Sequence, residues 1–257
     1  MSAPRGNGNN RQPAVCLGDR SMKVRKSPKN MQKDDLPSFG KPPVIETVIG
    51  VQFDPIPNLT SAHFGWYWRD FLGKTWVRTQ EAMALPDQVE TFGEQTRRFP
   101  FPSLSATLLP SDRSPRIQFI NENDDRVTQI QNTRFIYNWR KREAAYPRFK
   151  DLYPEFTAGL SRFREFLRSA SLGDATFNQW EVTYINHIEK GETWKTPEDW
   201  HKVLPGLLPP SVKSPGVRLE RESGELVFEI VPERGRLYVQ IGSGRSPEGG
   251  NELLAMQ

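Results

Sequence analysis

The first regular pattern of apolar and polar positions begins at residue 44. In Val44–Phe53 the odd-numbered positions are apolar apart from Thr47, while the even-numbered positions are mixed. This loose alternation predicts a strand with one buried face. Two prolines within Asp54–Asn58 end the strand, because proline cannot donate a hydrogen bond to a sheet.

Helical periodicity follows in three segments. Residues 60–72 carry a bulky aromatic stripe at helical spacing, which we interpret as core rather than as a platform for stacking bases. Over Pro147–Ala170 the apolar positions recur with a period near 3.6, which predicts the longest helix. Thr196 is expected to cap a short helix that ends by Leu204.

The other patterned segments predict strands. They are Gln88–Phe92, Arg116–Asn121, Arg126–Trp139, Thr176–Glu189, Val217–Arg221, Leu226–Val231, Arg236–Ile241 and the start of one more in Asn251–Gln257. We expect turns at Glu122–Asp125, Ser223–Gly224 and Glu233–Gly235, and mainly loop over residues 85–115. This order predicts an α+β fold, a largely antiparallel sheet with one long and two shorter helices packed on it. Two related halves are an alternative arrangement.

The basic character of the chain comes from its first thirty residues. The net charge is +4, with 35 Lys and Arg against 31 Asp and Glu. Residues 1–30 hold seven of these basic side chains and one acid, so the remaining residues have 28 against 30 and a net charge of −2. We expect residues 1–38 to be a disordered basic leader, with the true start near Met31. Residues 39–257 are then a single domain, expected to continue beyond Gln257.

Composition limits the chemistry of this domain. Cys16 is the only cysteine and lies in the leader, so the domain has no disulfide, no thiolate ligand and no cysteine nucleophile. No apolar run is long enough for a membrane span. We expect a cytoplasmic protein without a membrane association, a metal site or a cofactor.

One pair of residues has the spacing for acid–base chemistry. His187 and Glu189 share a strand face, and the carboxylate could orient the imidazole. At the end of a strand the same pair is also consistent with an ordinary surface arrangement. These two residues are the only catalytic candidates.

A basic and aromatic segment, Asn138–Arg142, is a candidate binding surface. Arg134 and Arg140 share a face, and with Trp139 they could contact phosphate. Alternatively, Asn138 and Arg140 pair with Glu46 or Glu189 inside the sheet. The candidate binding residues are Glu46, Arg134, Asn138, Trp139, Arg140 and Asn186.

Three segments together resemble a known family. Pro42–Phe53, Asn138–Phe149 and Tyr184–Glu189 occur in the same order as in a sporadically distributed family of uncharacterised bacterial proteins. The similarity covers about residues 40–241. It implies no activity and no catalytic residues. Members of the family start close to the first strand and run on to a final strand and helix, so this chain departs from them by ending early.

These observations favour a non-enzymatic binding or accessory protein that acts with a co-encoded protein partner. One alternative is a nucleic-acid-binding protein that uses Arg134, Arg140, Lys141 and Arg142 with Trp139. The second alternative is an enzyme that uses His187 and Glu189.

Overall fold

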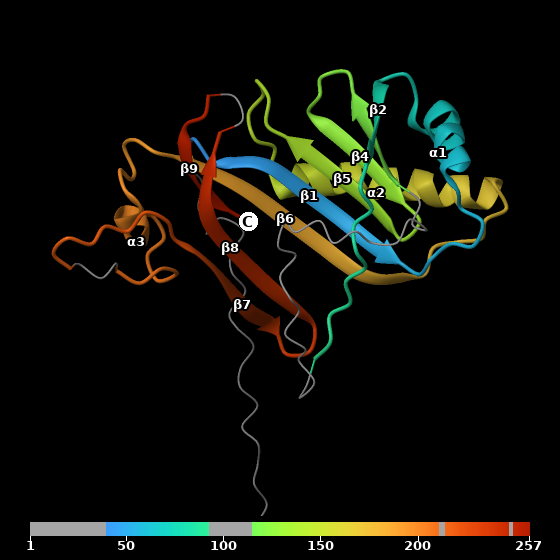
Figure 1. Ribbon diagram of the computed structural model, residues 1–257. Coiled ribbons are helices and arrows are strands. Elements are labelled where there is room, and N and C mark those ends of the chain that lie inside the picture. Colours follow the sequence, from blue (N-terminus) through green and yellow to red (C-terminus); the bar gives the residue numbers. More distant parts are fainter. Residues whose placement is uncertain (1–39, 93–114, 211–213, 247–248) are drawn as a thin grey trace, which may run out of the picture. The chain divides into compact units, whose positions relative to one another are not determined.

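The computed structural model describes residues 40–92, 115–210, 214–246 and 249–257, and within these ranges nine strands form one sheet (Figure 1). All of its pairings are antiparallel, and the strand order is β2-β3-β4-β5-β1-β6-β9-β8-β7. The strands are β1 Val44–Phe53, β2 Trp76–Ala82, β3 Arg116–Asn121, β4 Arg126–Gln131, β5 Arg134–Arg140, β6 Phe177–Glu189, β7 Ser223–Val231, β8 Gly235–Arg245 and β9 Glu252–Met256.

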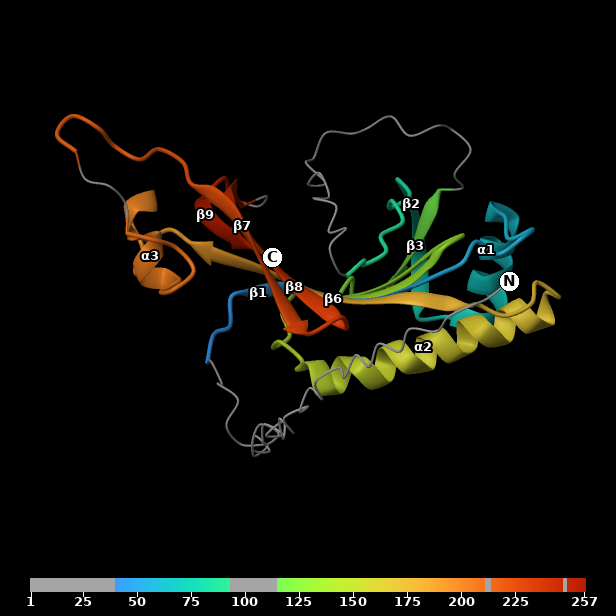
Figure 2. The same ribbon diagram turned by 90° about the horizontal axis from the view of Figure 1, so that it is seen from below.

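One face of the sheet is covered by the long helix α2, Phe149–Ser169 (Figure 2). Its apolar stripe packs with the odd-numbered side chains of β1 and β5 into the main core. The helix approaches the sheet closely at Gly159, where a Cβ would lie 3.2 Å from the Phe135 ring. Helix α1, Ser61–Tyr67, and the π-helical turn η1, Trp68–Leu72, add aromatic side chains to the same core. We call this the helical face and the opposite one the polar face.

A second, smaller core lies at the other end of the sheet. It contains Trp194, Trp200 and Leu204, packed on Ile241 of β8 and Leu254 of β9. The short 3₁₀ helix η2, Pro197–Asp199, and helix α3, Trp200–Val203, form its outer side. Thr196 begins this segment with a capping box, as expected from the sequence.

The structure confirms an antiparallel sheet with one long helix and little other helix. The strands over Val44–Phe53 and Thr176–Glu189 and the helix over Pro147–Ala170 lie within two residues of their expected bounds. The sheet is continuous, and an origin from two related halves stays a prediction.

The expectation of a single strand over Arg126–Trp139 is wrong, because this segment forms two strands, β4 and β5. The chain reverses at Asn132 and Thr133, and Gln131 of β4 lies opposite Arg134 of β5. The side chain of Asn132 accepts a hydrogen bond from the Ile56 amide at 2.8 Å, which holds this turn in place. Apolar residues continue on both sides of the turn, so the pattern did not reveal it.

Three further expectations need correction. Strand β2 was missed because it is an edge strand with a mostly exposed, polar sequence. Gln88–Phe92 does not join the sheet, and its backbone bonds to side chains instead. Val217–Arg221 is not a strand, and Ser223–Gly224 is not a turn. These two residues lie in β7, opposite Gly242 and Ile241, because pairing with β8 overrides their local turn preference.

Lys41–Gln257 forms one compact unit. The expectations for the leader, including its disorder and the start near Met31, fall on residues 1–39, outside the described residues. That the domain continues beyond Gln257 also stays a prediction.

Candidate functional site

Several of the predicted binding residues form a hydrogen-bonded row on the polar face. Asn138 donates to the carboxylate of Glu46 at 2.6 Å, and the Arg140 Nε donates to the same oxygen at 3.3 Å. The expected pairing of Asn138 and Arg140 with an acid is therefore confirmed, and the partner is Glu46. Behind Asn138 the row continues through two buried amides. Gln129 donates to Asn138 at 2.7 Å, and Gln118 donates to Gln129 at 2.9 Å.

Arg134 lies farther along the same face and is almost completely buried. Its side chain is 3% exposed, and its Nη1 donates to both carboxylate oxygens of Glu181 at 2.8 and 2.9 Å. The Nη2 donates to the Gln52 side chain and to the Pro86 carbonyl at 2.9 and 2.8 Å. Space for the Glu181 carboxylate comes from Gly50, where a Cβ would lie 2.5 Å from its Oε1. This arginine has no free surface with which to contact phosphate.

A strap of extended chain, residues 85–92, crosses the polar face. Its backbone is held by side chains of the sheet: the amide of Gln88 donates to Gln52 at 2.8 Å, and the amide of Glu90 donates to Gln179 at 3.2 Å. Strap residue Glu90 also accepts a hydrogen bond from Tyr238 of β8 at 2.8 Å and forms an ion pair with Arg236. The strap therefore links β6 to β8, two strands that are not neighbours in the sheet.

The structure separates the aromatic member of the predicted basic patch from its arginines. Trp139 is 1% exposed and packs on the helical face against Tyr146, with ring centroids 5.1 Å apart. Arg142 bonds to Asp124 at 2.5 and 3.1 Å, and Lys141 is exposed. An exposed combination of tryptophan with Arg134 and Arg140 is not formed.

His187 and Glu189 lie on the polar face of β6, opposite Ala255 and Leu253 of β9. The part of the chain that the structure describes contains no hydrogen bond between the two side chains. Partial burial lowers the pKa of His187, and the nearby charge of Glu189 opposes this shift. Asn186, the remaining candidate, is buried on the helical face, and its amide donates to the Met256 carbonyl at 3.3 Å.

One feature of the sheet was not visible in the sequence. Strand β9 pairs with only part of β6 and part of β8. It pairs with Asn186–Glu189 of β6 and with Ile241–Arg245 of β8. Farther along, residues 180–184 and 236–239 have no sheet partner on the β9 side among the described residues. We call the space between these two stretches the β6–β8 slot.

Backbone hydrogen-bonding groups point into the slot from both sides. Gln240 of β8 exchanges two hydrogen bonds with Gln257, at 2.8 and 2.9 Å, so the backbone groups of Tyr238 and Arg236 face the same way. On β6 the Lys190 amide donates to Glu252 of β9 at 3.0 Å. By the same alternation, Trp180, Val182 and Tyr184 direct their amides and carbonyls into the slot.

The two sides of the slot differ in chemistry. On the helical face it is flanked by exposed apolar side chains: Trp180 is 55%, Val182 48% and Leu237 49% exposed. On the polar face the strap residue Glu90 spans it, with its contacts to Gln179 and to β8. The two stretches therefore carry exposed apolar side chains on the helical face and contact Glu90 on the polar face.

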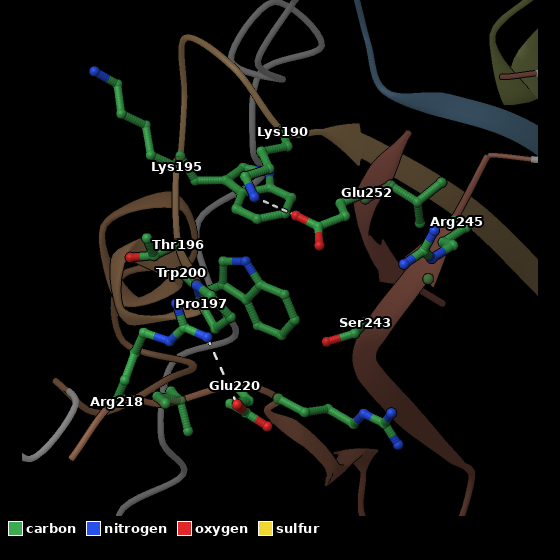
Figure 3. Close-up of a pocket in the computed structure, with 15 residues that line it drawn as sticks. Lys190, Lys195, Thr196, Pro197, Trp200, Arg218, Glu220, Ser243, Arg245 and Glu252 are labelled. Carbon is green, nitrogen blue, oxygen red and sulfur yellow. Dashed lines mark hydrogen bonds and ion pairs between the residues drawn. The ribbon is translucent and has the colours of Figure 1, made fainter. Parts of the chain in front are cut away.

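A pocket of about 430 Å³ lies beside the second core (Figure 3). Most of its charged side chains are already neutralised or turned away. Lys190 is paired with Glu252, Arg218 lies 3.6 Å from Glu220, and Lys195 points out of the pocket. With so few convergent groups, the pocket is a weaker candidate than the slot. Within the described residues, no cluster of three potential metal ligands is found, and no helix is long and apolar enough to cross a membrane.

The slot could not be foreseen from the chain, although one signal of it was present. Trp180, Val182 and Tyr184 are large residues that alternate on one face of the expected strand Thr176–Glu189. Their exposure is visible only when the neighbouring strands are in place. No protein-family model, curated protein or solved structure matches the chain, so its resemblance to a bacterial family stays a prediction.

Proposed function

We propose that the chain is a non-enzymatic binding protein that holds a co-encoded protein partner against the helical face of β6 and β8. One observation carries this proposal: the large apolar side chains of Trp180, Val182 and Leu237 are about half exposed on this face. Aromatic and aliphatic side chains of this kind are typical anchors of protein interfaces.

The exposed side chains support a protein partner. Single apolar residues on a surface are ordinary, but a group of them on one face is typical of interaction sites. The strap beneath the slot is fixed to both strands, which supports a site that exists before the partner binds.

The test is co-expression of the full chain with the products of its neighbouring genes, followed by size-exclusion chromatography. We expect a stable complex with one neighbour, and its loss in Val182→Asp and Leu237→Asp, because each change places a charge beside the slot. Val227→Asp is the matched control. Val227 is 50% exposed, close to the 48% of Val182, but it lies on the polar face of β7, away from the slot.

A complex that survives both slot substitutions would contradict the proposal, as would the absence of a complex with every neighbouring product. Circular dichroism of each variant shows whether the fold is intact, which the exposure of the substituted side chains leads us to expect.

A further inference from the structure

Arg116, the first residue of β3, is a partly buried arginine on the polar face without an acid of its own. It shares this face with Gln118, since Ile117 between them packs against the main core. The Nε of Arg116 is buried and unpartnered, and within the described residues none of its nitrogens forms a hydrogen bond or an ion pair. A guanidinium keeps its proton in a protein, so this positive charge persists.

The register of the sheet places Arg116 in one row with Arg134. Ile117 of β3 pairs with Ile130 of β4, so Arg116 is level with the next residue, Gln131, which in turn pairs with Arg134 of β5. The two arginines therefore lie two strands apart on the same face. Because Arg134 is buried and already paired, it adds positive charge to this row but offers no accessible donor.

Arg140, near the other end of β5, has donors to spare. Its Nε bonds to Glu46 at 3.3 Å, whereas its two Nη groups have no protein partner in the part of the chain that the structure describes. The side chain is 26% exposed, so these groups can be reached. Burial lowers the pKa of Arg116, the charges of Arg134 and Arg140 lower it further, and Glu46 opposes them. The charges of Arg116 and Arg140 are thus close enough to act on each other.

The charges of this region do not balance. Three arginines, Arg116, Arg134 and Arg140, share two carboxylates, Glu46 and Glu181, which leaves one positive charge in excess. A partly buried cation without a partner is costly. A ligand with a single negative charge would remove this cost, and a carboxylate matches the planar fork of a guanidinium. A phosphate dianion would bring a second negative charge close to Glu46.

We propose that Arg116 and Arg140 bind the carboxylate group of a ligand on the polar face. This site lies on the opposite side of the sheet from the proposed partner surface and does not depend on it. Two kinds of ligand share this chemistry, a small organic acid and the C-terminal carboxylate of a peptide.

Thermal unfolding of the full chain in about 100 mM sodium acetate, compared with an equal concentration of sodium chloride, tests the site. We expect acetate to raise the Tm by at least about 2 °C, because a ligand that binds only the folded state stabilises it. N-acetylglycine represents a peptide C-terminus, and its neutral amide should have no effect. A larger shift with N-acetylglycine than with acetate identifies a peptide ligand, and equal shifts identify a small acid.

Two arginine variants locate the effect. Arg116→Gln should remove the acetate shift and should raise the Tm in chloride, since it removes a charge that has no partner. Arg78→Gln is the matched control. Arg78 lies on the neighbouring strand β2 and is 59% exposed and paired with Asp124, so this variant should keep the acetate shift.

Chemical modification by phenylglyoxal, followed by peptide mass spectrometry, tests the wild type without relying on the folding of a variant. Acetate should slow the modification of Arg116 at least about threefold and leave that of Arg78 unchanged. The proposal is overturned by a wild-type Tm that is the same in acetate and chloride, by an acetate shift that persists in Arg116→Gln, or by equal modification of Arg116 in the two salts.

Discussion

The carboxylate of Glu181 reaches the buried guanidinium of Arg134 through space that exists because residue 50 is a glycine. The two side chains come from β6 and β5, and they meet across the intervening strand β1 at 2.8 and 2.9 Å. A buried arginine without a charged partner is costly. The stability of the polar face therefore depends on residue 50 having no side chain, because only then can Glu181 reach Arg134.

Gly50→Ala should therefore destabilise the fold by about 2–3 kcal/mol, because the new methyl group displaces the carboxylate from Arg134. The backbone of Gly50 has no positive φ, so alanine is otherwise acceptable at this position. The measurement is urea unfolding, in a double-mutant cycle with Glu181→Ala. With Glu181 absent, Gly50→Ala should cost little or stabilise slightly. An equal cost in both backgrounds would show that the clash is with something else.

Glu46→Gln should destabilise the protein by about 1 kcal/mol, because it removes the charge that Asn138 and Arg140 share. Glu189→Gln is the matched control. Glu189 was the other acid that the sequence offered as a partner, but it is exposed, and we expect a change below about 0.5 kcal/mol. Urea unfolding of both variants gives the comparison, and equal effects would argue against the polar row.

The two tryptophans of the second core should respond differently to phenylalanine. The Nε1 of Trp194 donates to the Ile188 carbonyl at 3.0 Å, whereas the Nε1 of Trp200 is buried and has no hydrogen-bond partner in the described structure. Both substitutions remove similar volume, but only Trp194→Phe leaves a carbonyl without its donor. We expect Trp194→Phe to cost about 1 kcal/mol more than Trp200→Phe. Thermal unfolding of the two variants measures this difference, and the reverse order would contradict the assignment.

Glu155 should contribute to the pH dependence of stability. Burial alone would raise the pKa of Glu155, but hydrogen bonds from Arg126 and Tyr137 hold it below its usual range. A carboxyl with a lowered pKa stabilises the fold above its unfolded pKa, about 4.3, and this contribution disappears as the pH falls through the folded pKa. The effect should be modest, about 1 kcal/mol, because the side chain is 39% exposed.

The check is urea unfolding of the wild type and Glu155→Gln at pH 7 and pH 3. We expect the wild type to be more stable at pH 7 and the two proteins to approach each other at pH 3. A difference that is independent of pH would mean that the charge of Glu155 is not what stabilises this contact.

Much of the local structure was predictable because it depends on neighbours in the sequence. The alternation of Val44–Phe53 and the period of Pro147–Ala170 record which side of each element is buried, and both elements are found. Glu46 could also be named as a partner of Arg140, since charged residues on adjacent sheet positions are expected to pair.

Other features depended on contacts that no local pattern records. Strand β2 has few apolar residues, and only its pairing with β3 makes it a strand. Trp139 was grouped with the basic residues around it, although strand alternation directs its ring to the opposite face. Residues 85–92 read as a strand or a loop, and the glutamines that hold them come from β1 and β6.

The sequence by itself determined the main helix, most strands, the charge difference between leader and domain, and the absence of thiol chemistry from the domain. These follow from residue type and periodicity, which act over a few neighbouring positions. The tertiary structure alone decided the strand order, the role of Gly50 and the exposure of Trp180 and Val182. Each of these depends on which distant segments become neighbours.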